Sequence, residues 1–210
     1  MSLLLLNDTH HSASLEALKR WLGKRGKRPS VGYLAATADP TREYFAPIVE
    51  LYDSLGAEII AFAEPIHGPD CELYEPLFDC DIIHLCGGNT FEYLHNLGAS
   101  GLIPRLQAFV AGGGHLVGVS AGAMLMTPDI ATAVYCGDEA VMPFQTTAAL
   151  GLVPFQLLVH VQNKAAMADE IKLSQTQGEL YLLGDGDAID VEDGMVSASE
   201  GVVIVGDLAG

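Results

Sequence analysis

Short apolar runs alternate with segments in which apolar residues recur every three or four positions. The short runs are typical of buried β-strands, and the wider spacing is typical of helices that bury one face. Strands are predicted at Leu3–Leu6, Val31–Ala36, Glu58–Phe62, Asp81–Leu85 and His115–Val119. Helices are predicted at Ser12–Leu22, Thr41–Leu55, Thr90–Leu97 and Ile103–Ala111, with another opening at Ala121. Continuously apolar strands separated by amphipathic helices indicate a parallel sheet covered on both faces.

The pattern loosens after Pro154. Further strands are predicted at Phe155–Val159, Glu179–Leu183, Ile189–Val191, Met195–Ala198 and Val202–Val205, with a helix near Ala165–Ser174. The turn Glu192-Asp193-Gly194 joins two of these strands as a hairpin, which predicts an antiparallel edge. No repeat or linker divides the chain. We therefore expect residues 1–210 to form a single α/β domain with a doubly wound, mostly parallel sheet.

The charge is strongly negative and unevenly distributed. Ten Lys and Arg against 27 Asp and Glu give −17, and a surface this negative repels phosphate backbones, so no nucleic-acid partner is expected. Six of the ten cations lie within Lys19–Arg28, which contains no acid. We interpret this run as a solvated helix end, favoured by the helix dipole, on the side of the sheet opposite the catalytic strand ends. A partner-binding patch is the alternative.

The cysteines and the N-terminus suggest no metal, cofactor or membrane. Cys71, Cys80, Cys86 and Cys136 lack the spacing of metal ligands. The apolar run Leu3–Leu6 is too short for a signal peptide or a membrane span. A cytoplasmic protein with reduced thiols is the expectation.

The motif Gly118-Val119-Ser120-Ala121-Gly122 lies between a predicted strand and a predicted helix. A serine in such a turn is held in a strained backbone with its hydroxyl exposed above the sheet edge, as in serine hydrolases. The N–H of Ala121 can then face an oxyanion. The alternative is a glycine-rich turn with a capping serine, because short patterns recur by chance.

A second glycine-rich turn, Gly87-Gly88-Asn89-Thr90, follows the strand that ends at Leu85. Ligands of open α/β sheets bind at this edge, so its free N–H groups can supply a second oxyanion donor, with Asn89 and Thr90 holding the substrate. Thr90 as a helix N-cap is the alternative. Cys86 is interpreted as a small buried side chain rather than a rival nucleophile.

A serine nucleophile needs a base and an orienting acid. Of the seven histidines, His160 ends a strand and begins a polar loop, whereas His84 and His115 lie in predicted buried strands. Asp185 follows another strand and is the expected acid, with Asp187 and Asp190 left open as competitors. The order Ser, His, Asp differs from the Ser, Asp, His order of α/β-hydrolases, which indicates a different scaffold.

Together, GGNTF at Gly87–Phe91, GVSAGA at Gly118–Ala123, the segment from Gly151 to His160 and the GDG around Asp185 resemble the aspartyl dipeptidase (peptidase E) family of serine peptidases. Cyanophycinases belong to the same superfamily. The resemblance runs from about Val31 to the C-terminus. It implies a sheet related to class I glutamine amidotransferases.

By position, the resemblance implies that Ser120 is the nucleophile, His160 the base, and Asp185 the acid in place of the usual Glu. Gly88 and Ala121 would donate to the oxyanion.

The sequence departs from the family in one place that bears on specificity. The arginine expected after His160, which would read an acidic side chain, is absent, and only Lys164 and Lys172 are nearby. The expected function is therefore a serine peptidase acting on dipeptides or very short peptides, with an N-terminal Asp as one candidate specificity. Alternatives are a cyanophycinase-like isopeptide hydrolase and a non-catalytic binding protein. The oligomeric state, including a homodimer, is left open.

Overall fold

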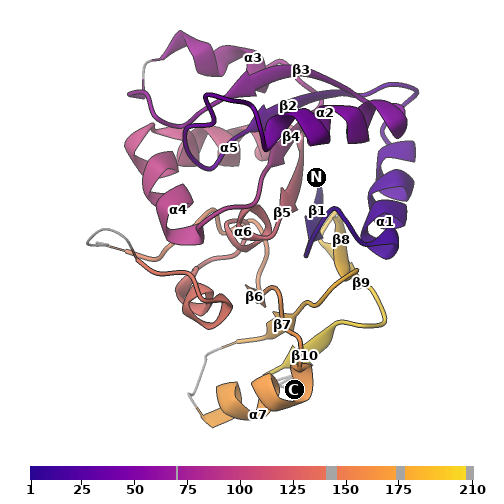
Figure 1. Cartoon of the computed structure of the whole chain (residues 1–210), viewed down its shortest axis with the longest axis vertical. Coiled ribbons are helices and arrows are strands. Elements are labelled where there is room, and N and C mark those ends of the chain that lie inside the picture. The colour runs from indigo at the N-terminus through magenta and orange to yellow at the C-terminus, as the bar shows by residue number, and fades with distance from the viewer. Residues whose placement is uncertain (70, 141–145, 174–177, 207–210) are drawn as a thin grey trace.

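The computed structural model describes residues 1–69, 71–140, 146–173 and 178–206, without the side chains of 170–173. Within them a seven-stranded sheet has the order β3-β2-β4-β5-β1-β8-β9 (Figure 1). Its strands are β1 (Ser2–Leu6), β2 (Ser30–Leu34), β3 (Glu58–Ala63), β4 (Ile82–Leu85), β5 (His115–Val119), β8 (Ala188–Glu192) and β9 (Met195–Ala198). The first five are parallel, and β8 and β9 add an antiparallel edge. The mostly parallel α/β fold predicted from the sequence is confirmed.

A smaller sheet accounts for the remaining strands. It has the order β10-β7-β6, with β6 (Gln156–Leu158) parallel to β7 (Leu180–Leu182) and β10 (Val203–Val205) antiparallel to it. Together with α7 (Lys164–Leu173) it lies below the main sheet in Figure 1. This second sheet was not predicted, because the pairing of β6 with β7 is not encoded in either strand alone.

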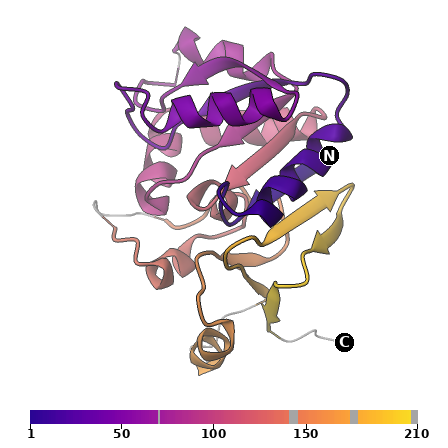
Figure 2. The same cartoon turned by 45° about the vertical axis from the view of Figure 1, so that its right-hand side comes forward.

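Helices cover both faces of the main sheet. α1 (Ser12–Gly23) and α2 (Phe45–Ser54) lie in front of it in Figure 2. Leu4 and Leu6 of β1 pack in one buried cluster with Trp21 of α1. Leu3 and Leu5 belong to a second cluster with side chains of α4 (Thr90–Ala99) and α5 (Leu102–Ala111). The fully apolar β1 is thus explained by burial on both faces.

Helix starts show where local capping differs from the prediction. His11, not Ser12, caps α1 through its ring Nδ1, which accepts from the Ala13 N–H. α2 begins at Phe45 rather than near Thr41, because the Asp39 carboxylate accepts from backbone N–H groups just before and at its first residue. Several short helices were not predicted: η1 (Glu72–Tyr74), α3 (Glu75–Phe78) and η2 (Ala131–Cys136).

The basic run lies at the amino-terminal edge of the sheet, as predicted. Lys24 pairs with Asp190 and Glu192, and Arg25 pairs with Glu192 while its guanidinium lies 4.3 Å from the centre of the Trp21 ring. The Arg25 side chain is only 5% exposed, so this part of the run is packed rather than solvated. Among the described residues, no helix has the length and apolar character needed to cross a membrane.

Candidate active site

Ser120 occupies the turn between β5 and α6 (Ala121–Met124), at the carboxyl edge of the sheet. Its backbone has φ 52° and ψ −114°, a strained combination for a residue with a side chain. Its N–H donates to the Leu6 carbonyl at 2.9 Å, which ties the turn to the end of β1. The strain is what the G-x-S-x-G pattern predicted for this position.

The two glycines of the motif are required by close approach. A Cβ at Gly122 would lie 2.2 Å from the carbonyl oxygen of Leu85, and one at Gly118 would lie 2.5 Å from the carbonyl oxygen of Gly122. Both contacts are with backbone, which has little freedom to move away. The glycines therefore allow the Ser120 turn to pack directly against the end of β4.

His160 lies against the serine. The Ser120 Oγ and His160 Nε2 atoms are 2.7 Å apart, the distance of a short hydrogen bond between a hydroxyl and an imidazole. His160 has φ 59°, and its N–H donates to the Asn7 Oδ1 at 2.7 Å. The structure thus brings together two residues that the sequence placed 40 positions apart.

Asn7 is a site residue that the sequence analysis missed. It is fully buried at the end of β1, and its own N–H donates to the Asp187 carbonyl at 3.1 Å. It therefore joins β1 to the His160 loop and to the segment before β8. The available signal was a polar residue directly after the apolar run Leu3–Leu6, where a parallel strand reaches the ligand-binding edge.

The candidate acids differ in how they are held. The Asp185 carboxylate is exposed and has no hydrogen bond or ion pair within the described residues, including to His160. Asp187 is buried, and its carboxylate accepts from the Gly184 N–H at 2.9 Å and the Ser199 hydroxyl at 2.8 Å while pairing with Lys164. These contacts occupy the Asp187 carboxylate, which holds the segment between β7 and β8 in place.

The other competitor and the two lysines are also placed. Asp190 pairs with Lys24 at the amino-terminal edge, away from Ser120. Lys164 is bound to Asp187 and to the Gly201 carbonyl, so it is not free to pair with a substrate carboxylate. The side chain of Lys172 lies outside the described residues.

The predicted oxyanion donors flank the serine. A Cβ at Gly87 would lie 3.6 Å from the Ser120 Cβ, so the Gly87-Gly88 turn passes beside the nucleophile. Gly88 has φ 151°, and a Cβ there would lie 2.8 Å from the Ala36 Cβ. In the described structure the N–H groups of Gly88 and Ala121 have no acceptor. Both remain available to an incoming oxygen.

Asn89 and Thr90, the predicted substrate contacts, separate in the structure. Asn89 lines the cavity beside Ser120, and its Oδ1 caps α4 by accepting from the Glu92 N–H at 2.9 Å. Thr90 is 1% exposed, and its hydroxyl faces the Met124 sulfur at 3.9 Å. The Thr90 side chain does not reach the cavity, because Thr90 is the first residue of α4 and its side chain is buried in the core.

The cavity holding Ser120 and His160 has a volume of about 590 Å³. Its walls include Asp8, Asp39, Glu43 and Glu92. Burial alone would raise the pKa of Asp8, but N–H groups of Gly186, His11 and His10 donate to its carboxylate and lower that pKa to about 2. Asp8 is therefore ionised throughout the neutral range.

Two other side chains at this edge, His84 and Cys86, are kept in their neutral forms by burial. Burial lowers the pKa of His84 to about 3, and its Nδ1 lies 2.9 Å from the Tyr52 hydroxyl, which confirms it as a neutral core residue. Burial raises the pKa of the Cys86 thiol to about 11, so it is not a thiolate nucleophile at neutral pH. Within the described residues, no group of three or more His, Cys, Asp or Glu could hold a metal ion.

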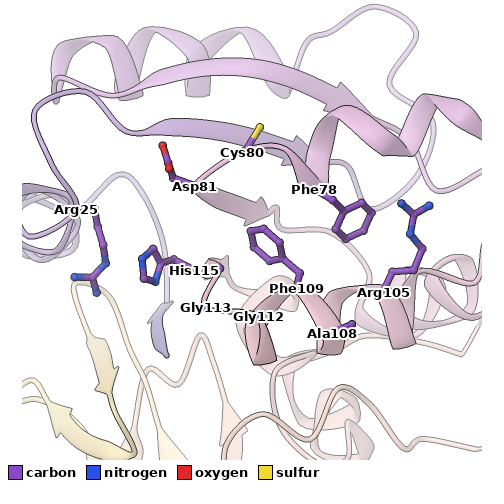
Figure 3. A pocket seen from close by; sticks show the side chains of 11 residues that line it. Arg25, Phe78, Cys80, Asp81, Arg105, Ala108, Phe109, Gly112, Gly113 and His115 are labelled. Carbon is purple, nitrogen blue, oxygen red and sulfur yellow. The ribbon is translucent and has the colours of Figure 1, made fainter.

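A cavity of about 600 Å³ lies at the opposite edge of the sheet. Figure 3 shows Arg25 and His115 at one end of it, Phe78 and Arg105 at the other, and Phe109 between them. Its lining contains no serine, and burial raises the pKa of its thiol, Cys80, to about 11, so that this side chain is not a thiolate at neutral pH. The Ser120–His160 pair therefore distinguishes the carboxyl-edge cavity as the candidate active site.

Residues 3–199 match the profile of peptidase family S51, so the chain belongs to this family. It is 26% identical over 166 residues to a peptidase E from Nostoc sp. (strain PCC 7120), covering 77% of this chain and 65% of that protein. It is 30% identical over 125 residues to a peptidase E from Citrobacter koseri, covering 57% of this chain and 53% of that protein. The chain thus spans between about half and two thirds of the length of these curated relatives.

Solved structures share the fold. A candidate peptidase E from Listeria monocytogenes EGD-e matches with a TM-score of 0.72 at 22% identity, over 97% of this chain and 96% of that one. A peptidase from an acI-B1 Actinobacterium matches with a TM-score of 0.66 at 21% identity, over 98% of this chain and 87% of that one. The predicted resemblance to the peptidase E family is confirmed.

Proposed function

We propose that this protein is a serine peptidase that hydrolyses dipeptides or very short peptides. The observation that carries the proposal is the 2.7 Å separation of Ser120 Oγ and His160 Nε2 at a strained strand–helix turn. Membership of peptidase family S51 supports the reaction class. A cavity of about 590 Å³ is of the size that encloses a small molecule, which favours a short substrate.

In the proposed reaction, Ser120 Oγ attacks the scissile carbonyl carbon while His160 Nε2 accepts the hydroxyl proton. The carbonyl oxygen becomes an oxyanion, and the free N–H groups of Gly88 and Ala121 donate to it. His160 then gives its proton to the leaving amine as the C–N bond breaks, leaving an acyl-serine. Water, deprotonated by His160, hydrolyses this ester and restores Ser120.

Asp185 is the proposed orienting acid. Of the three acids considered, Asp187 is held by Lys164 and Ser199, and Asp190 is held by Lys24. Of these three, only Asp185 has a carboxylate without a partner among the described residues, and it follows β7, which pairs with β6, the strand that ends two residues before His160. Its proposed role is to accept from the His160 ring N–H and stabilise the imidazolium.

The test is an assay of the hydrolysis of a panel of dipeptides and tripeptides, in which cleavage is monitored by the release of free amine. Wild-type protein is expected to cleave at least one member, and Ser120→Ala and His160→Ala are expected to abolish that cleavage. Retained cleavage in Ser120→Ala would contradict the mechanism. Including β-Asp-Arg in the panel separates the isopeptide alternative from cleavage of ordinary peptide bonds.

A further inference from the structure

The cavity beside Ser120 is lined by four carboxylates without a balancing cation. Asp8, Asp39, Glu43 and Glu92 lie in its walls, and its lining contains no Lys or Arg. Its buried histidine, His84, is neutral at physiological pH because burial lowers its pKa to about 3. A concave site with walls of one charge focuses that potential on whatever enters it.

The cations of the chain lie elsewhere. Six of the ten are in Lys19–Arg28 at the opposite edge, and Arg105 lines the cavity there. The guanidinium of Arg42 lies 3.4 Å from the centre of the Phe62 ring, and Lys164 is paired with Asp187. No Lys or Arg side chain that the structure describes therefore faces the substrate cavity.

Two of the four carboxylates are free to meet a ligand. Asp8 and Asp39 each accept backbone N–H groups of the protein. The carboxylates of Glu43 and Glu92 make no hydrogen bond or ion pair with any described residue. Glu43 precedes α2 and Glu92 lies in the first turn of α4, so the two come from different walls of the cavity.

We propose that this cavity selects peptides whose first residue is Lys or Arg, with Glu43 and Glu92 as the specificity-determining residues. The proposal rests on the proposed function only in placing the scissile carbonyl at Ser120. The lining also contains Tyr33 and Ala35, which suit the aliphatic stem of such a side chain while the carboxylates meet its charged end. An acidic first residue would instead meet four like charges without a cation.

The test compares the binding of Lys-Leu and Asp-Leu to the Ser120→Ala protein by calorimetry at low ionic strength. Lys-Leu is expected to bind at least about tenfold more tightly, and its advantage is expected to shrink as salt is added. Changing Glu43→Gln and Glu92→Gln together is expected to reduce the ratio of the two affinities about tenfold. Glu50→Gln, which removes an exposed carboxylate of α2 outside the cavity lining, is the matched control and should leave that ratio unchanged.

Tighter or equal binding of Asp-Leu would overturn the proposal, as would a preference that survives the double substitution. Because the Ser120→Ala protein binds without turnover, the result does not depend on catalysis. If wild-type protein cleaves no peptide while Ser120→Ala still prefers Lys-Leu, the peptidase proposal fails and the cationic site stands. If wild-type protein cleaves Asp-Leu as efficiently as Lys-Leu, the peptidase stands and the specificity fails.

Discussion

The two edges of the central sheet carry cavities of nearly equal volume, about 590 Å³ at the carboxyl edge and about 600 Å³ at the amino edge. Their linings differ. At the amino edge Arg25 and Arg105 each lie over an aromatic ring and pair with a glutamate. At the carboxyl edge a strained serine contacts a histidine. The difference shows that the arrangement of reactive groups, and not the size of a hollow, identifies the candidate active site.

The contrast follows from strand direction. In a parallel sheet all strands end at the same edge, so the residues that follow them lie close together there. Asn7, Gly87 and Ser120 therefore meet although they are far apart in sequence. The amino edge receives the ends of helices, which is where the basic run lies.

The largest effect is expected for Ser120→Ala, which should lower kcat/KM by at least about 10³-fold because the nucleophile is lost. Arg105→Ala, in the opposite cavity, should change kcat/KM by less than about twofold, since that cavity has no part in the proposed reaction. Peptide hydrolysis assays on both variants check this. Equal losses in the two variants would remove the distinction between the edges.

Asp185→Asn should lower kcat by about 10²- to 10⁴-fold through the wrong imidazole tautomer, with the melting temperature little changed. Asp187→Asn should instead leave kcat little changed and lower the stability of the protein. It leaves Lys164 without its buried partner and should cost about 1–3 kcal/mol of stability. Kinetics and urea unfolding separate the two effects. Full activity in Asp185→Asn would mean that Ser120 and His160 act without this acid.

Two histidines, one near each edge, should differ in how they couple stability to pH. Burial lowers the pKa of His84 from 6.5 to about 3, so between these values the unfolded chain binds a proton that the folded protein does not. The contribution of His84 to the free energy of unfolding is therefore fully present above about pH 6.5. It falls as the pH drops through this window, by about 2–3 kcal/mol at pH 4.5. His115 is less buried, and burial followed by the Arg25 charge lowers its pKa in the same direction.

Urea unfolding at pH 7 and pH 4.5 measures this coupling. His84→Gln should reduce the difference in unfolding free energy between the two pH values more than His115→Gln does. If His84→Gln loses as much stability as wild type on acidification, the assignment of the effect to His84 is wrong.

The smallest effect is expected for Lys24→Ala at the amino edge. Its ion pairs with Asp190 and Glu192 are half-exposed, so their loss should cost at most about 1 kcal/mol and less at high salt. Dipeptide hydrolysis should be unchanged. Thermal unfolding at low and high salt checks the first expectation, and a larger, salt-independent loss would show that the pair has a packing role.

Strands were the most predictable part of the fold. His115–Val119 has the bounds that the hydrophobic pattern predicted, because burial of a strand leaves a direct signature in its own residues. Met195–Ala198 also has its predicted bounds although it is exposed, because the turn Glu192-Asp193-Gly194 marks where this hairpin strand begins. The start of α2 was misplaced because Asp39, whose carboxylate accepts from the N–H of the first helical residue, Phe45, lies several residues before the helix. Short helices such as α3 have too few residues to show a period.

The candidate site was predictable where its signal is local. The flanking glycines and the strand–helix position indicated Ser120, and the end of a strand indicated His160. Their contact depends on the alignment of β5 and β6 in three dimensions, which neither segment encodes. Asn7 was missed for the same reason, since its partner is the His160 backbone. Thr90 was assigned to the cavity because its position beside Asn89 does not reveal that its side chain turns inward.

The central claim is that Ser120 is activated by His160, and covalent labelling tests it most directly. Wild-type protein treated with a fluorophosphonate should gain one adduct by intact mass, located on Ser120 by peptide mapping. The adduct should be absent in Ser120→Ala and form far more slowly in His160→Ala. No adduct on wild-type protein, or an adduct on another residue, would contradict the account.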